Sequence, residues 1–130
     1  MYNALAVLRE VFVLEKDSLN QRIRDGLLLD AYGPLLTEKQ RLACELVLIN
    51  DLSLAEAAES LEVSRQGVHD LVARSREHME ELESSLRLIE KDAQLETAAE
   101  LLENNKEQLP REFYIKMKET LKTTTEASER

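Results

Sequence analysis

The fold is decided by the stretch LSLAEAAESLEVSRQGVHDLV, residues 52–72. Ser53 followed three residues later by Glu56 is a capping box, and it opens a first helix whose apolar residues recur at helical spacing. Glu62 interrupts this helix, and Ser64 is the N-cap of a second one. The apolar residues expected to join the two helices are Ala58, Leu61, Val63, Val68 and Leu71. This pattern is typical of a helix-turn-helix, whose second helix presents its first turns to a nucleic-acid groove.

Two further helices are predicted before this stretch. Residues 1–25 carry apolar side chains broadly at helical spacing, and the helix is expected to stop near Tyr32 because Pro34 disfavours helical backbone in the residue before it. The apolar positions are Leu5, Leu8, Phe12, Leu19 and Ile23. This face is expected to pack against the core or a partner. A membrane-surface role is disfavoured because basic residues are few.

The next helix is predicted to begin after Thr37 and to end near Asn50. Thr37 and Gln40 form a second capping box, and the apolar run that follows suits the central helix of a small bundle. Cys44 lies in this run, and as the lone cysteine it excludes an internal disulfide and a cysteine-based metal cluster. We expect it to be a buried thiol in a reducing compartment.

After residue 72 the second helix of the bihelical stretch has no stop signal. Its apolar residues form a heptad-like seam, which suits intramolecular packing or a dimer interface. The seam consists of Met79, Leu82, Leu86, Ile89 and Ala93. Pro110 can open a final helix carrying Phe113, Met117 and Leu121, and the polar residues 123–130 are expected to be disordered.

Composition agrees with a helical reading of the whole chain. The 130 residues include only 3 Gly and 2 Pro, and Leu, Ala, Glu and Lys abound. The predicted fold class is all-α: a small helical bundle containing a helix-turn-helix, with a C-terminal helical arm. The predicted division is a helix-turn-helix domain with an N-terminal helical segment over residues 1–91, and an arm with a disordered end over residues 92–130.

The chain is expected to be soluble and cytoplasmic, because it shows no basic signal-peptide start and no run of roughly 20 apolar residues. We expect no enzyme activity, no cofactor and no metal. There is no glycine-rich phosphate loop and no Ser/His/Asp arrangement with a physical rationale. His69 and His78 lie nine residues apart, so they face different sides of a helix and could not share a metal ion.

The charge pattern both supports and opposes a nucleic-acid site. Residues 64–76 contain Arg65, Arg74 and Arg76 against Asp70 alone, so positive charge collects on the second helix. Arg65, Gln66 and His69 are donors on its first turns, while Lys39 and Arg41 could add backbone contacts from the earlier helix. The chain as a whole carries a formal net charge of −9, which weakens binding to phosphates.

Three segments resemble the YlxM family, small bacterial helix-turn-helix proteins linked to the signal recognition particle pathway. They are YGPLLTEKQR at residues 32–41, NDLSLAE at 50–56 and VSRQGVHD at 63–70, within a match spanning roughly residues 14–91. A broader similarity is to region 4 of bacterial sigma factors. The resemblance implies an all-α cytosolic accessory protein that acts with the particle's GTPase or its RNA and lacks catalytic residues. A homodimer is one state that it implies.

The nucleic-acid role of the family carries over only to matching positions, which are Ser64, Arg65, Gln66, His69 and Asp70. Three residues depart from the pattern. Glu62 stands at the turn where Gly or Asn is favoured, which costs about 1 kcal/mol if the left-handed backbone is kept. Gly67 stands where the family usually has Ala, and His69 replaces a commoner aromatic residue.

Three functions remain open from the sequence. The first is a noncatalytic accessory factor of the signal recognition particle that binds its RNA, its GTPase or both. The second is a DNA-binding transcription regulator that uses Arg65, Gln66 and His69 in the major groove. The third is an adaptor whose bihelical module binds only protein. A continuous basic face around Arg65 would favour nucleic acid, and an interrupted one would favour protein.

Overall fold

A computed structural model describes the backbone of residues 4–128 and the side chains of residues 18–122. Every regular element in that part of the chain is helical, which confirms the all-α fold class. The chain divides into two units, Met1–Arg87 and Leu88–Arg130, so the division falls four residues before the boundary expected after residue 91.

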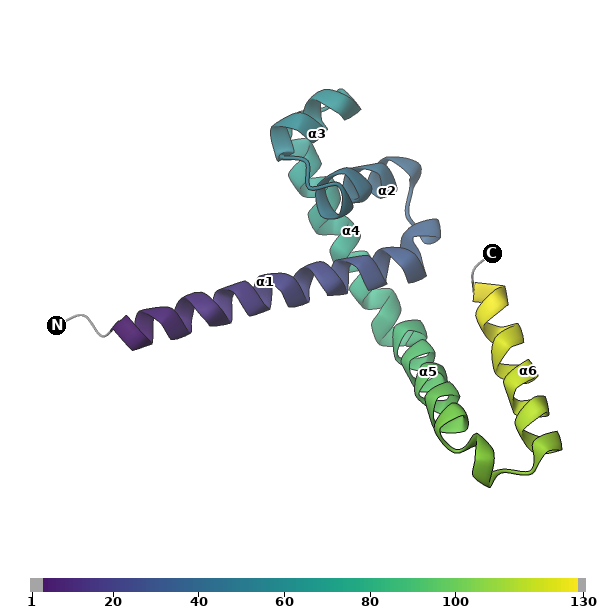
Figure 1. Ribbon diagram of the computed structural model, residues 1–130. Helices are drawn as coiled ribbons and strands as arrows, with labels where there is room; N and C mark the ends of the chain where they lie inside the picture. Colours follow the sequence, from purple (N-terminus) through teal and green to yellow (C-terminus); the bar gives the residue numbers. More distant parts are fainter. Residues whose placement is uncertain (1–3, 129–130) are drawn as a thin grey trace. The chain divides into compact units, whose positions relative to one another are not determined.

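The first unit contains four α-helices and two short helical segments (Figure 1). They are α1 (Ala4–Tyr32), the 3-10 turn η1 (Gly33–Leu35), α2 (Glu38–Cys44), the π-helical segment η2 (Glu45–Ile49), α3 (Leu54–Leu61) and α4 (Arg65–Leu86). The first helix ends at Tyr32 as predicted, and Gly26 does not interrupt it.

The three predicted N-caps are confirmed. The Thr37 hydroxyl accepts a hydrogen bond from the Gln40 backbone at 3.2 Å, and the Ser53 hydroxyl accepts one from the Glu56 backbone at 3.1 Å. Both capping boxes are closed by the returning side chain. Between α3 and α4, Glu62 adopts the left-handed conformation with φ 57° and ψ 41°, so the turn keeps its geometry without a glycine.

The helix-turn-helix core lies between α2, α3 and the first half of α4. Its buried residues are Ala43, Ala57, Ala58, Val68 and Val72, and half-buried Leu61, Val63 and Leu71 pack against it. Small alanines on α2 and α3 allow the α4 backbone to approach closely, as the sequence predicts for Ala58. This core confirms the bihelical reading of residues 52–72.

The second half of α4 crosses α1, and polar pairs join the two helices. Asp25 is 2% exposed and accepts two hydrogen bonds from the Arg76 guanidinium, at 3.1 and 2.8 Å. The Tyr32 hydroxyl donates to the buried Glu83 carboxylate at 2.6 Å. Arg24 and Glu80 form a more exposed bidentate pair beside them.

Two helix expectations need correction. The helix opened by Thr37 reaches its predicted end near Asn50 only by widening into a π-helix at Glu45. The sequence predicts no stop for the helix after residue 72, but α4 ends at Leu86. Arg87 adopts left-handed backbone with φ 55°, and its N–H donates a hydrogen bond to the Glu83 carbonyl. The predicted seam from Met79 to Ala93 is therefore broken.

The second unit is a hairpin of α5 (Leu88–Asn104) and α6 (Arg111–Ser128), joined through the 3-10 turn η3 (Lys106–Gln108) (Figure 1). Leu102 is its buried apolar residue, and the Tyr114 hydroxyl donates to Glu103 at 2.6 Å across the hairpin. The final helix follows Pro110 as predicted.

Some sequence-based expectations fall outside the described side chains. The predicted packing of Leu5, Leu8 and Phe12 lies in residues 1–17, and residues 129–130 are also outside the description. The backbone of α6 continues to Ser128, so the helix extends into the segment 123–130 for which disorder was expected. In the part of the chain that the structure describes, none of the helices has the length and apolar character that a membrane span requires.

Candidate nucleic-acid interface

The first turn of α4 is fixed by Ser64. Its hydroxyl accepts a hydrogen bond from the Gly67 backbone N–H at 2.9 Å, which satisfies one of the free donors at the helix N-terminus. A Cβ atom on Gly67 would lie 3.1 Å from this hydroxyl oxygen. The glycine at this position therefore suits the cap, although alanine would be the better helix former.

The side chains that the sequence predicts for contact on α4 are all exposed. Arg65, Gln66, His69, Asp70 and Arg74 face solvent. They are not equally available, because the Gln66 amide donates to Asp70 at 3.0 Å and the His69 ring nitrogen Nδ1 lies 3.4 Å from the same carboxylate oxygen. Asp70 therefore occupies part of the hydrogen-bonding capacity of two predicted base-contacting residues.

Acidic and basic side chains are mixed on this face. Gln66, Asp70 and Arg74 follow one another at intervals of four residues and Glu77 comes three residues later, so they share one exposed row of the helix. Arg65 lies outside this row, on the first turn. Among the described residues, neither arginine forms an ion pair or a side-chain hydrogen bond. The face therefore places two carboxylates beside two available guanidinium groups.

The sequence count of positive charge on α4 included Arg76, and the structure corrects it. Arg76 points to α1, where both Asp25 oxygens hold its guanidinium. Its side chain is 41% exposed, while that of Asp25 is 3% exposed. The third positive charge thus neutralises a buried carboxylate and is used for folding. The outer face of α4 is interrupted by acid and is not continuously basic.

The two basic residues predicted on α2 do not join this face through any contact in the described residues. Lys39 is exposed, and Arg41 lies 3.9 Å from Glu45 on the next turn. Arg41 also lines a cavity with the end of α1. The sequence offered no signal for this placement, because α2 and α4 are joined by packing and not by a local motif.

Sequence reasoning also missed Glu77 as a member of the face, although its spacing from Asp70 could have shown it. It missed Asp25 as the partner of Arg76, and no local pattern could have shown a pair 51 residues apart. Within the described residues, no group of three His, Cys, Asp or Glu side chains could hold a metal ion. Cys44 is buried as predicted, and burial raises the pKa of its thiol.

Comparison with known proteins places most of the chain, including the helix-turn-helix, in one family. Residues 19–124 match the family described as "Putative helix-turn-helix protein, YlxM / p13 like". The chain is 45% identical over 78 residues to a UPF0122 protein of Clostridium kluyveri, covering 60% of this chain and 70% of that protein. It is 42% identical over 89 residues to a UPF0122 protein of Halalkalibacterium halodurans, covering 68% and 79% respectively. The chain therefore belongs to the YlxM / p13-like family of helix-turn-helix proteins.

Proposed function

We propose that this chain is a noncatalytic, cytoplasmic accessory protein of the signal recognition particle pathway, and that the outer face of α4 docks onto the particle's GTPase. The observation that carries the choice of a protein target is that Asp70 and Glu77 lie on the same exposed face of α4 as Arg65 and Arg74. Phosphate groups are repelled by these carboxylates, whereas a protein surface can present both charges to match the face.

Two further observations support the proposal. The segments at residues 32–41, 50–56 and 63–70 resemble the YlxM family, which is linked to this pathway. The net charge of −9 also gives the chain an unfavourable long-range field for RNA or DNA. A docking role needs no catalytic group, cofactor or metal.

A second candidate function is DNA binding, and one observation favours it. Arg65 and Arg74 are exposed, and among the described side chains neither has an ion-pair partner. Arginine is the residue best suited to bidentate contact with guanine. In this reading the chain is a transcription regulator whose Arg65 and Gln66 enter the major groove, with Asp70 accepting from a cytosine amine.

Calorimetric titration of the purified chain separates these targets. The GTPase alone, the particle's RNA alone and a mixed DNA duplex are titrated at about 50 and 200 mM salt. We expect binding to the GTPase with an affinity that depends weakly on salt. The rate of GTP hydrolysis, measured separately, should change when the chain is added. Absence of both binding and a rate change would remove the proposal, and RNA or duplex binding that falls steeply with salt would replace it.

A charge reversal tests the face itself. Asp70→Arg makes the row basic, so we expect affinity for the GTPase to fall by about tenfold and affinity for RNA to rise. The matched control is Glu96→Arg, which makes the same charge change at an exposed position on α5. Equal effects of the two variants would show that net charge, and not this face, determines binding.

A further inference from the structure

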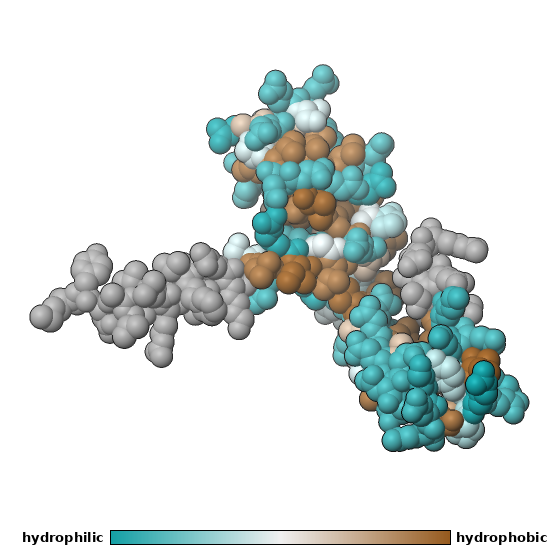
Figure 2. Space-filling view, viewed as in Figure 1, coloured by the Kyte–Doolittle hydropathy of each residue, from teal (hydrophilic) through white to brown (hydrophobic). Residues whose placement is uncertain are grey.

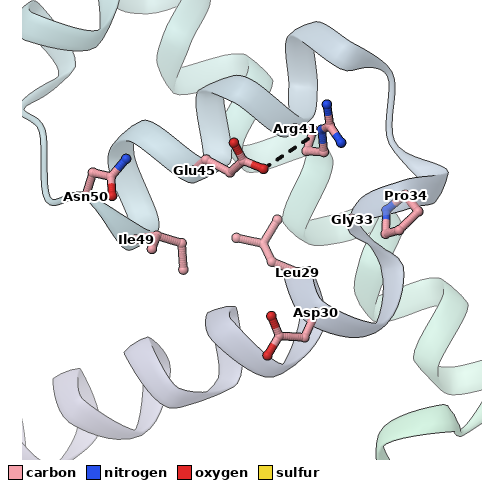
Figure 3. A pocket seen from close by; sticks show the side chains of 8 residues that line it. All are labelled: Leu29, Asp30, Gly33, Pro34, Arg41, Glu45, Ile49 and Asn50. Atoms are coloured by element: carbon pink, nitrogen blue, oxygen red, sulfur yellow. Dashed lines mark ion pairs between the residues drawn. The ribbon is translucent and has the colours of Figure 1, made fainter. Parts of the chain in front are cut away.

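A cavity lies between the end of α1 and the π-helical segment η2, within the first unit. Its volume is about 550 Å³, which falls in the usual range for sites that hold a ligand. Figure 3 shows Leu29 of α1 and Ile49 of η2 on either side of it. The described residues that line the cavity include none from α4, so it is separate from the candidate face on that helix.

The π-helical turn shapes one wall of this cavity. The Asn50 backbone N–H donates a hydrogen bond to the Glu45 carbonyl at 2.9 Å, so one wide turn joins two residues that are five apart. In an α-helix such residues would face different sides, whereas here both line the cavity. π-Helical turns are rare and occur frequently at functional sites. The distortion of this helix therefore coincides with the cavity.

The cavity has a polar side with unused hydrogen-bonding groups. Asp30 is exposed, and among the described residues its carboxylate has no ion-pair partner. It lies in the last turn of α1, where a negative charge is unfavourable, so helix stability does not explain it. The Nε atom of Arg41 is 3.9 Å from Oε1 of Glu45, which is too long for a hydrogen bond. Two carboxylates against one guanidinium leave this side short of one positive charge.

The other side of the cavity is apolar and partly uncovered. Leu29 lines it, and Ile49 is 50% exposed although it is a large aliphatic residue. Apolar surface continues along α1, because Ile23 and Leu27 precede Asp30 by seven and three residues and are 54 and 44% exposed. Figure 2 shows apolar surface along the described part of α1. A ligand in the cavity therefore meets aliphatic and acidic groups side by side.

An ion pair ties the two walls of the cavity together. The Arg22 guanidinium holds both carboxylate oxygens of Asp51, at 2.7 and 2.6 Å, and Asp51 directly follows the lining residue Asn50. Arg22 is thereby occupied within the chain and does not compensate the charge of Asp30. A site whose walls are already held in place needs little reorganisation when it binds a ligand.

We propose that this cavity binds a helical segment of a partner protein that carries a leucine and an arginine on adjacent turns. The leucine lies between Leu29 and Ile49, and the arginine donates hydrogen bonds to the carboxylates of Asp30 and Glu45. Helices bind in grooves through anchors at this spacing, and guanidinium pairs well with carboxylates. Nucleic-acid phosphates would be repelled by the same carboxylates. The proposal does not depend on the partner of α4, because the two surfaces share no described residue.

NMR titration of the isotope-labelled full chain tests this directly. The probe is a short alanine-based helical peptide with a leucine and an arginine four positions apart. We expect the backbone signals of residues that line the cavity, including Asp30, Gly33 and Ile49, to shift. The same peptide with glutamate in place of arginine should bind at least about tenfold more weakly. Absence of shifts at these residues, or equal or tighter binding of the glutamate peptide, would overturn the proposal.

A charge reversal in the chain identifies the contact. Asp30→Arg should raise the dissociation constant of the arginine peptide by about tenfold and should lower that of the glutamate peptide. Glu59→Arg makes the same charge change at an exposed position on α3 and should leave both constants unaltered. A positive charge near the end of α1 favours the helix, so circular dichroism should show no loss of helix content in Asp30→Arg. Equal effects of the two variants would overturn the proposal, because net charge alone would then determine binding.

A truncation tests the apolar side of the cavity. Ile49→Ala should weaken binding of the arginine peptide by about threefold to tenfold, because part of the leucine contact is lost. Leu101→Ala, at a 59% exposed position on α5, should leave the affinity unaltered. Shifts of the cavity signals when the chain alone is concentrated would place a second copy there and overturn the proposal. Peptide-induced shifts confined to the outer face of α4 would overturn it as well.

Discussion

The two halves of α4 pack against the rest of the first unit by different physics. The first half places Val68 and Val72 against the alanines of α2 and α3, and this contact is apolar. The second half places Arg76, Glu80 and Glu83 against α1, so charged and hydroxyl groups join this contact beside the buried apolar residues Met79 and Leu28. One helix thus carries an apolar interface followed directly by one to which buried polar pairs are added.

The difference shows what each interface specifies. Apolar packing stabilises the helix-turn-helix in proportion to buried area and tolerates small shifts. Buried polar pairs add little net stability, but they require their partners in one geometry, and loss of one partner is costly. We infer that the first contact makes the bihelical unit stable and that the second fixes the direction in which α1 leaves it.

The largest expected effect is at the polar interface. Arg76→Ala leaves the buried Asp25 carboxylate without its cation, although Gln21 still donates to it at 2.9 Å. We expect the free energy of unfolding, measured by urea denaturation, to fall by about 3 kcal/mol. Arg74→Ala is the matched control and should change it by less than about 0.5 kcal/mol. A loss at Arg76 as small as that at Arg74 would erase the contrast between the two halves.

The apolar half should respond less strongly to a single truncation. Val68 is 0% exposed, and Val68→Ala removes two methyl groups from the core between α3 and α4. We expect a loss of about 2 kcal/mol in the same denaturation experiment. Leu101→Ala, at a 59% exposed position on α5, should be nearly neutral. If Val68→Ala lowered the free energy of unfolding more than Arg76→Ala, the apolar contact would be the more sensitive of the two to loss of a side chain.

The bihelical unit could be predicted because its signals are local. Each N-cap is set by residues three apart, and the core of α3 and α4 follows from apolar spacing within residues 52–72. The left-handed turn falls at Glu62, the position where the general helix-turn-helix pattern favours Gly or Asn. These features depend on neighbours in the chain, so the order of residues determines them.

The polar interface and the end of α4 could not be predicted, for two physical reasons. Asp25 and Arg76 are distant in sequence, and either could equally be a solvated surface charge. Arg87 ends α4 without glycine or proline, so the usual stop signal is absent. The charge of the candidate face was misjudged for the same reason, since only the tertiary structure pairs Arg76 with Asp25 on α1.

Two tyrosine hydroxyls, those of Tyr32 and Tyr114, test how burial affects the contribution of a hydrogen bond to stability. Tyr32→Phe removes the 2.6 Å hydrogen bond to buried Glu83, and we expect a loss of about 1–2 kcal/mol. Tyr114→Phe removes a bond of the same length to exposed Glu103, where water can replace the donor, so the loss should be clearly smaller. Equal losses in the free energy of unfolding would show that burial does not determine how much the Tyr32–Glu83 hydrogen bond stabilises the chain.

The turn between the two helices should accept a stabilising change. Glu62 has φ 57°, which glycine adopts without strain, so Glu62→Gly should raise the free energy of unfolding by about 0.5–1 kcal/mol. Glu59→Gly lies inside α3 and should lower it by a similar amount. If both substitutions destabilised the chain, the left-handed turn would be under no strain.

The smallest effect concerns the exposed edge of the polar interface and its dependence on pH. The hydrogen bonds from Arg24 lower the pKa of the Glu80 carboxyl, so the folded state favours the ionised form. The stability from this pair is present above the ordinary pKa of 4.5 and is lost as the pH falls through the lowered value.

Denaturation curves between about pH 6 and 3 measure how the free energy of unfolding falls with pH. Glu80→Gln should reduce this fall by less than about 1 kcal/mol, because the side chains of Arg24 and Glu80 are both more than one third exposed. Glu77→Gln makes the same charge change on the outer face of α4, where among the described residues the carboxylate has no ion-pair partner. It should leave the slope closer to that of the unmodified chain. High salt should reduce the difference between the two variants, since an exposed pair is screened and a buried one is not. A difference that persists in high salt would place the Arg24–Glu80 pair with the buried contacts, and would extend the polar interface of α4 to its surface.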